Sequence, residues 1–381
     1  MPTPTPHAAT MPRSGIRRVM DAAWASGRPF IGMHVGEPDF DPPAHVAAAG
    51  AQAYLDGDTH YVPNGGIPEL TRALVEKLRT ANGIEVAPEQ VVVSAGGAQA
   101  LHLALSMTLA AGEEVLVPDP GWPNYRMAVG LLQGVPVGYP LRPEQGFVPV
   151  VADLEALLTP RTRVLVVNSP SNPLGTVIPG PRLEELVRFA ERHDLWLLSD
   201  ECYDALTYGV AHVSPATFDR TGCVLSAFSF SKTYAMTGVR VGYLVCPASV
   251  APVAAKLQEP MVACVNAPAQ RAALAALTGP QERVHEMRGT YDARRRLALD
   301  LLEQAGIPHV VPHGAFYLWA DVSARAGGDV ESWAVRLLEQ ERVAVAPGTA
   351  FGAGGEGWVR LSLATSTDDI REGIAAIGRM A

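Results

Sequence analysis

The sequence contains few lysines. Lys and Arg together number 30 in 381 residues, and only Lys77, Lys232 and Lys256 are lysines. A GC-rich genome, which favours arginine and alanine codons, would explain most of this bias. Any chemistry that needs a primary amine therefore has three candidate residues.

Cysteine and histidine are arranged in ways that exclude two common classes of site. The four cysteines form no Cys-x-x-Cys pair, and the ten histidines form no His-Glu-x-x-His motif. We therefore expect neither a disulfide framework nor a zinc-hydrolase site, and no metal.

The chain is also poor in charge, because 18% of its residues are charged and the net charge is −9. Binding to nucleic acid or to an anionic membrane needs a basic surface, so neither partner is expected. No apolar run approaches the ~18 residues that span a bilayer, and the N-terminus MPTPTPHAATMP lacks the apolar segment of a signal peptide. The remaining composition is that of a folded globular protein, and we expect it in the cytoplasm.

Helical and strand patterns alternate from Ser14 onward. The Val- and Leu-rich runs are apolar without alternation, which is typical of parallel strands covered by helices on both faces. The sequence therefore predicts an α/β fold: a large domain with a mostly parallel, doubly wound sheet and a smaller α+β domain. We expect a disordered tail at 1–13, an N-terminal segment at 14–45 that joins the small domain, the large domain at 46–285 and the small C-terminal domain at 286–381. The helices are expected near 14–26, 43–56, 67–81, 97–110, 122–132, 181–194, 248–277, 281–305, 329–340 and 367–379.

Polar residues follow several of the predicted strands. Asn172, Asp200 and Lys232 come shortly after apolar runs, and Gly96-Gly97-Ala98 lies between a run and a helix. In an open parallel sheet such positions share one edge, where ligands bind. The Gly-Gly turn would favour an anion, although a plain tight connection also explains it. It lacks the Gly-x-Gly-x-x-Gly pattern of dinucleotide-binding proteins.

Lys232 differs from the other two lysines. Lys77 and Lys256 are expected to be solvated groups on amphipathic helices, whereas Lys232 follows an apolar strand and has no acidic residue near it in the sequence. Burial lowers the pKa of a lysine, and a neutral amine is what a Schiff base requires. Ser229 and Arg240 could bind a phosphate close by.

The segment FSFSKTYAMTGVRVGY around Lys232 resembles the cofactor-attachment segment of the class I/II, fold-type I aminotransferases, which depend on pyridoxal 5′-phosphate. Seven further motifs appear in the order of that family: GEPDFDPP (36–43), HYVPNGGIPELTRAL (60–74), GGAQAL (96–101), PGWPNY (120–125), NSPSNPLGT (168–176), SDECY (199–203) and WVRLSLA (358–364). The resemblance covers about residues 14 to 380 and is closest to the bacterial aspartate aminotransferase-like subgroup.

The resemblance implies a role for each candidate residue. Lys232 would hold the cofactor as a Schiff base and move the proton at the substrate's Cα, and Asp200 would pair with the ring nitrogen. Tyr203 and Asn172 would hydrogen-bond the phenolic oxygen, and Trp122 would stack on the ring. The phosphate would be bound by Gly96, Gly97, Ala98, Ser229 and Arg240. Arg360 would clamp the substrate's α-carboxylate, helped by Gly36 and Asn172.

Ordinary structural explanations stay open for these residues. Asp200 could cap a helix, Trp122 could anchor a core, Tyr203 could pack at an interface, and Arg360 could face solvent from its strand.

The resemblance also implies a homodimer with shared active sites. In such a dimer Tyr61 would reach the phosphate of the neighbouring subunit's cofactor, and residues 265–267 would border the neighbour's site. Isologous two-fold pairing is the commonest oligomer.

Two departures from the subgroup concern the substrate. Bacterial aspartate aminotransferases of this subgroup carry a lysine where this chain has Ala98, and use Ser and Thr where it has Ser14-Gly15-Ile16. A less cationic pocket favours a neutral or aromatic amino acid as donor, with a 2-oxo acid such as 2-oxoglutarate as acceptor, and an acidic donor stays open.

Two other functions remain to be separated from amino transfer. A carbon–sulfur β-lyase of the same fold begins with the same removal of a proton from Cα. A non-catalytic sensor fused to a winged helix would need roughly 60 further residues for its DNA-binding domain, and only about 13 precede the first expected helix.

Overall fold

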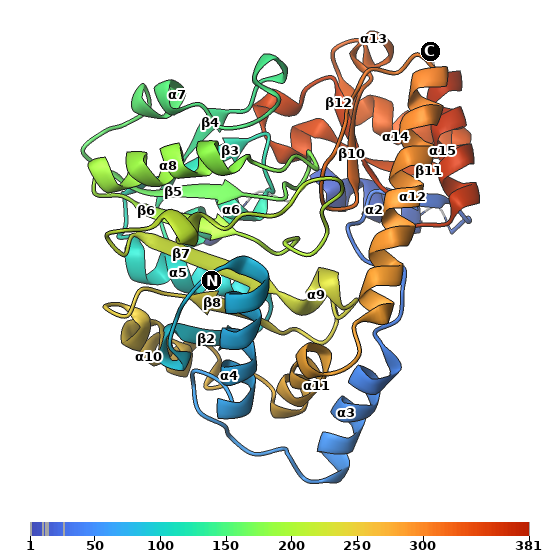
Figure 1. Ribbon diagram of the computed structural model, residues 1–381. Coiled ribbons are helices and arrows are strands. Elements are labelled where there is room, and N and C mark those ends of the chain that lie inside the picture. The colour runs from blue at the N-terminus through green and yellow to red at the C-terminus, as the bar shows by residue number, and fades with distance from the viewer. Residues whose placement is uncertain (1, 10, 12–14, 26, 381) are drawn as a thin grey trace.

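The computed structural model describes residues 2–9, 11, 15–25 and 27–380, which are organised around two β-sheets (Figure 1). The larger sheet has seven strands and the smaller has five. Among the described residues, no helix is both long enough and apolar enough to cross a bilayer.

The seven-stranded sheet is mostly parallel, as predicted. Only β8 runs antiparallel to its neighbours among the strands described. In spatial order the strands are β2 (Val91–Ser94), β8 (Gly242–Val245), β7 (Val224–Ser229), β6 (Trp196–Asp200), β5 (Thr162–Asn168), β3 (Glu114–Asp119) and β4 (Val135–Pro140). β4 lies at the edge of the sheet, and its Pro136, Gly138 and Pro140 leave it without a continuous apolar run.

Both faces of this sheet are covered, which explains the continuous apolar runs. Val164 and Val166 of β5 pack in one core cluster with α5 (Gly97–Thr108), whereas Leu165 and Val167 pack in another with α8 (Gly180–Arg192). Successive strand residues point to opposite faces, so each run needs apolar residues at every position. The helices around the sheet are α3 (Ala44–Leu55), α4 (Pro68–Lys77), α5 (Gly97–Thr108), α6 (Asn124–Leu131), α7 (Val151–Glu155), α8 (Gly180–Arg192), α9 (Phe230–Thr233), α10 (Ala251–Val262) and α11 (Ala267–Thr278).

The five-stranded sheet joins the two ends of the chain. β1 (Ile31–Met33) pairs in parallel with β11 (Val343–Pro347), and antiparallel pairings continue through β12 (Trp358–Ser362), β10 (Tyr317–Asp321) and β9 (His309–Val310). Around it lie α2 (Gly15–Ala25), α13 (Ser323–Ala326), α14 (Val330–Glu341) and α15 (Thr367–Arg379), and the long helix α12 (Glu282–Gln304) runs from near α11 up to this sheet (Figure 1). The strand of the N-terminal segment therefore lies in the sheet of the C-terminal part, while the boundaries near 45 and 285 stay predictions.

Short helical turns complete the chain. A π-helical turn at Leu78–Asn82 continues α4, and 3₁₀ turns lie at Pro88–Gln90, Pro143–Gln145, Pro215–Phe218, Gly348–Phe351 and Ala353–Gly355. The predicted tail falls partly outside the described residues, and within it Pro6–Ala9 form one helical turn, α1.

The prediction of one helix over 248–277 was wrong. Pro260 lies inside α10, and the chain breaks between α10 and α11 where Ala263 leaves the helical conformation with a positive φ of 59°. Asn266 then caps α11 by accepting a hydrogen bond from the amide of Ala269 at 2.8 Å, and Pro268 occupies its first turn.

Candidate active site

A cavity of about 290 Å³ lies between the carboxyl ends of β5, β6 and β7 and the five-stranded sheet. We call it the site cavity. Of the residues predicted from the sequence, it is lined by Gly36, Gly97, Ala98, Trp122, Asn172, Asp200, Tyr203, Ser229, Lys232, Arg240 and Arg360. These residues come from segments more than 300 positions apart, and the fold brings them around one space.

Lys232 lies in α9, the single helical turn that follows β7. Ser229 caps this turn by accepting a hydrogen bond from the amide of Ser231 at 3.2 Å, and Lys232 Nζ donates to the carbonyl of Gly36 at 2.6 Å. Burial lowers the pKa of Lys232, and the positive charges of Arg360 and Arg240 act in the same direction. A lysine with a lowered pKa supplies the neutral amine that attacks a carbonyl carbon.

Asp200 is 4% exposed at the end of β6. Its Oδ2 accepts a hydrogen bond from the hydroxyl of Tyr125 at 2.6 Å, and its Oδ1 accepts one from the amide of Cys202 at 3.2 Å. Burial raises the pKa of Asp200, although both hydrogen bonds act against it. A cationic ligand placed against this buried carboxylate would stabilise its charged form.

The first turn of α5 forms an anion cradle with Ser229 and Arg240. Gly96 caps α5 with a φ of 81°, and a Cβ added to it would stand 2.4 Å from Nη2 of Arg240. Gly96 therefore shapes the cradle, although it does not line the cavity. Free amides at a helix start, a hydroxyl and a guanidinium together suit a phosphate.

Arg360 is 2% exposed in β12, so the expectation that a strand arginine faces solvent does not hold. Its Nη1 donates to Oδ1 of Asn172 at 2.8 Å and its Nη2 donates to the carbonyl of His34 at 2.6 Å. The guanidinium stacks 4.4 Å from the ring centre of Tyr317. Within the described residues no carboxylate acts on Arg360, and its Nε has no hydrogen-bond partner. A buried, unpaired cation is costly, so this arrangement favours a carboxylate ligand.

Three residues that the sequence did not single out position the predicted ones. Asn168 accepts from the amide of Asn172 at 2.7 Å and donates to the carbonyl of Asp200 at 3.0 Å. The hydroxyls of Tyr203 and Tyr317 lie 2.8 Å apart, and Tyr125 bonds Asp200. Asn168 and Tyr125 stand inside motifs that were recognised, but no spacing assigns them to these partners.

Gly36 makes the close approach of Tyr317 possible. A Cβ at position 36 would stand 1.9 Å from the Tyr317 hydroxyl, so no larger residue fits without moving that ring. The same glycine offers its carbonyl to Lys232.

Tyr61, unlike Gly96, is a predicted residue that lies away from the site cavity. Its side chain is 89% exposed and lies beside Tyr54, Cys264, Val265 and Asn266. Of the Ser14-Gly15-Ile16 segment, Ile16 lines the site cavity, while Ser14 lies outside the described residues.

Residues 28–377 match the family model of aminotransferases of class I and II. The chain belongs to this family. Its fold is accordingly the fold-type I fold of pyridoxal-phosphate-dependent enzymes, and the protein is an aminotransferase that depends on this cofactor.

Relatives of this aminotransferase cover nearly its whole length. A probable aspartate/prephenate aminotransferase of Aquifex aeolicus is 42% identical over 93% of this chain and 91% of its own. Aromatic-amino-acid aminotransferase 2 of Thermococcus litoralis is 39% identical over 94% of this chain and 93% of its own. The solved structure of aspartate aminotransferase from Thermus thermophilus with maleate is 40% identical, covers 100% of both chains and superposes with a TM-score of 0.95. These names include both acidic and aromatic substrates.

The residues of the site cavity fit pyridoxal phosphate. The cofactor requires an amine for covalent attachment, an anion opposite its ring nitrogen and a phosphate site. Lys232, Asp200 and the α5 cradle supply these three groups around one space, and Trp122 lines the same cavity.

Proposed function

We propose that this aminotransferase takes its amino group from a neutral or aromatic L-amino acid and passes it to a 2-oxo acid. The observation that carries this substrate class is the apolar wall of the site cavity, formed by Ile16, Met20, Ala98, Leu101 and Trp122.

The charges around the site cavity support this class. Its cationic lining side chains among the described residues are Lys232, Arg240 and Arg360, and the cofactor and the α-carboxylate of the substrate require all three. An acidic donor carries a second carboxylate, which would meet the apolar wall without a cation and would lose hydration there.

Each residue has a defined task in this proposal. When bound, pyridoxal phosphate supplies an electron sink for the pair left at the substrate's Cα. Lys232 Nζ would hold the cofactor covalently and would take the proton from the substrate's Cα. Asp200 would hold a proton on the ring nitrogen, and Arg360 would bind the α-carboxylate with its two terminal nitrogens.

The remaining residues bind and orient the cofactor. Tyr203 and Asn172 would donate hydrogen bonds to the phenolic oxygen, and Trp122 would cover the ring face. The amides of Gly97 and Ala98, the hydroxyl of Ser229 and the guanidinium of Arg240 would bind the phosphate.

The test is a set of single-turnover reactions of the loaded enzyme with phenylalanine, tyrosine, methionine, aspartate and glutamate, followed by visible absorbance. We expect an apolar or aromatic donor to react fastest. Ala98→Lys adds a cation to the wall and is expected to raise the rate with aspartate relative to phenylalanine by about tenfold or more. Aspartate as the fastest donor of the unmodified enzyme would contradict the proposal. Release of pyruvate from cysteine or cystathionine without an oxo acid would indicate a lyase instead.

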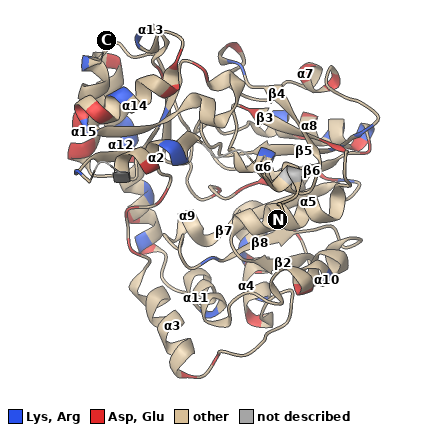
Figure 2. Cartoon of the chain, turned by 180° about the vertical axis from the view of Figure 1, so that it is seen from behind, with Lys and Arg blue, Asp and Glu red and all other residues tan. Residues whose placement is uncertain are grey.

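We also propose that the enzyme is a homodimer. Helix α3 carries no Asp, Glu, Lys or Arg and leaves Tyr54 58% exposed and Leu55 81% exposed. Charged residues are sparse on α3 and α11, whereas they gather on α14 and α15 (Figure 2). A helix that is apolar around most of its circumference is normally buried, and a second copy of the chain would cover it.

The dimer would place Tyr61 of one subunit at the phosphate of the other. Mixing a Tyr61→Ala chain with a Lys232→Ala chain would then create hybrids with one intact site, and activity is expected to appear on mixing. A monomer in light scattering, or two inactive variants that stay inactive although hybrids form, would refute this arrangement.

A further inference from the structure

Lys77 is not the solvated surface lysine that the sequence predicted. It ends α4, its side chain is 21% exposed, and its Nζ donates to Oδ2 of Asp204, whose side chain is 8% exposed. The ammonium also lies 4.6 Å from the ring centre of Phe228, which stacks on Tyr243. A buried carboxylate and an aromatic face thus hold this cation.

Asp204 belongs to the turn that carries the cofactor-binding residues. It follows Tyr203 directly and Asp200 by four positions. Its amide donates to the carbonyl of Glu201 at 3.0 Å, and the amide of Leu206 donates to the carbonyl of Tyr203 at 2.8 Å. This turn therefore holds the backbone of Tyr203, so its position contributes to where the Tyr203 hydroxyl lies, 2.8 Å from that of Tyr317.

The side chain of Asp204 connects this turn to α4. Besides Lys77, Nδ2 of Asn82 donates to its Oδ2 at 3.0 Å. Burial acts to raise the pKa of Asp204, but Lys77, His212 and Asn82 outweigh it and lower that pKa. Asp204 is therefore a carboxylate at neutral pH, and because it is buried, its charge has to be balanced by the ammonium of Lys77.

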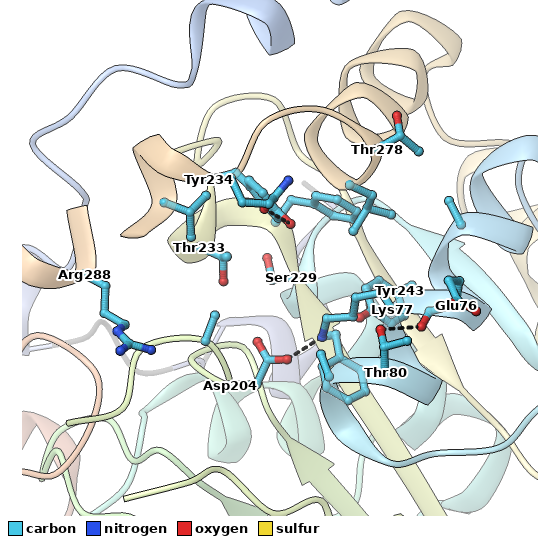
Figure 3. A pocket seen from close by; sticks show the side chains of 18 of the residues that line it. Glu76, Lys77, Thr80, Asp204, Ser229, Thr233, Tyr234, Tyr243, Thr278 and Arg288 are labelled. Atoms are coloured by element: carbon cyan, nitrogen blue, oxygen red, sulfur yellow. Dashed lines mark hydrogen bonds and ion pairs between the residues drawn. The ribbon is translucent and has the colours of Figure 1, made fainter. Parts of the chain in front are cut away.

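The pair lines a cavity of about 650 Å³ behind the attachment segment of the cofactor. We call it the rear cavity, and it is lined by Lys77, Thr80, Asp204, Ser229, Thr233 and Arg288, among others. Figure 3 shows Lys77 and Asp204 pointing toward one another at its edge. Ser229 lines both the rear cavity and the site cavity, so the two spaces lie on opposite sides of the turn that carries Lys232.

We propose that Lys77 is a positioning residue of the reaction: by pairing with Asp204 it holds the turn of residues 201–206, and thereby the hydroxyl of Tyr203, at the cofactor. The inference rests on the proposed role of Tyr203.

The first test compares Lys77→Met with Lys256→Met, since Lys256 is exposed on α10. In cofactor-free protein, amide hydrogen exchange at Asp204 and Leu206 is expected to rise about tenfold in Lys77→Met only. In the loaded enzyme, Lys77→Met is expected to shift the pH at which the visible absorbance of the cofactor changes. Its kcat is expected to fall about 10- to 100-fold, because a small displacement of a group at the reaction site lowers the rate by about that factor.

Chemical rescue provides a second readout without cofactor. Lys77→Ala leaves a space that opens on the rear cavity, and propylammonium has the size of the missing part of the side chain. Propylammonium, but not tetramethylammonium at equal ionic strength, is expected to restore slow amide exchange in residues 201–206.

Two outcomes would overturn the inference. One is a Lys77→Met protein with a lower melting temperature but unchanged exchange, absorbance and kcat, which would make the pair merely structural. The other concerns the double variant Lys77→Met/Asp204→Leu, which removes both charges and can be tested even if Lys77→Met alone does not fold. A normal kcat in this double variant would show that the Lys77–Asp204 pair is not needed to position Tyr203. Failure of the unmodified chain to bind pyridoxal phosphate would refute the proposed function, whereas amide hydrogen exchange in cofactor-free protein would still test whether the Lys77–Asp204 pair holds residues 201–206.

Discussion

The hydrogen bond from Tyr125 to Asp200 offers a sharp test of how the site works. The hydroxyl is 2.6 Å from Oδ2 of Asp200, and both residues are buried. This bond lowers the pKa of Asp200 against the effect of burial. Tyr125→Phe removes the hydroxyl alone, so it isolates the bond from the packing of the ring.

The magnitude follows from the nature of the acceptor. A hydrogen bond to a charged group contributes about 1.5–3 kcal/mol, and one pKa unit corresponds to about 1.4 kcal/mol. Its loss is therefore expected to raise the pKa of Asp200 by about 1–2 units. Since Asp200 and the ring nitrogen of the cofactor compete for one proton, that proton shifts toward Asp200, and kcat is expected to fall about tenfold or more.

The assay measures kcat in single turnovers and the dissociation constant of the cofactor in the same preparations. Tyr139→Phe is the matched control, because the Tyr139 hydroxyl is equally buried but donates to the neutral carbonyl of Val166 at 2.9 Å. The control is expected to lose stability and to keep kcat. If Tyr125→Phe kept both kcat and cofactor affinity within twofold, the argument that this bond tunes Asp200 would be wrong.

Three further predictions concern the groups around the carboxylate clamp. Arg360→Lys loses the two-pronged geometry and is expected to raise KM for the amino donor about 100-fold in steady-state kinetics; an unchanged KM would remove Arg360 from the clamp. Burial and the charge of Arg360 lower the pKa of His34 to about 4, so between pH ~6.5 and 4 the unfolded chain binds a proton that the folded chain does not, and stability falls as the pH decreases. In urea unfolding, His34→Gln is expected to remove about 3 kcal/mol of this pH-dependent fall in the free energy of unfolding. The same dependence of that free energy on pH in both proteins would contradict the prediction. Gly36→Ala would displace the Tyr317 hydroxyl and is expected to lower both kcat and the melting temperature. Normal kinetics would show that the backbone around Gly36 can move to accommodate the added methyl group.

The parallel sheet and most of the site were predictable because they depend on local patterns. Runs apolar at every position indicate strands covered on both faces, and the carboxyl ends of such strands meet at one edge. Asn172, Asp200 and Lys232 each follow such a run, and the structure places them around one cavity. The assigned tasks of these residues and the cytoplasmic location stay predictions.

The missed residues depend on contacts between distant segments. Tyr317 meets Tyr203 across 114 positions and Lys77 meets Asp204 across 127, and no period or motif in the sequence announces either pair. The broken helix at 263–266 is a different case, because Asn266 and Pro268 are ordinary signals of a helix start that the alanine-rich surroundings obscured.

The two partly buried lysines, Lys232 and Lys77, lie in different surroundings and have different proposed tasks. Lys232 has two arginines near it, which together with burial favour its neutral form, and a neutral amine is what covalent attachment requires. Lys77 lies on the other side of the same turn, against the Asp204 carboxylate and the Phe228 ring. An arginine could not replace Lys232, because a guanidinium stays charged and forms no Schiff base. Two of the three lysines in this arginine-rich chain thus lie on either side of the segment that is proposed to hold the cofactor.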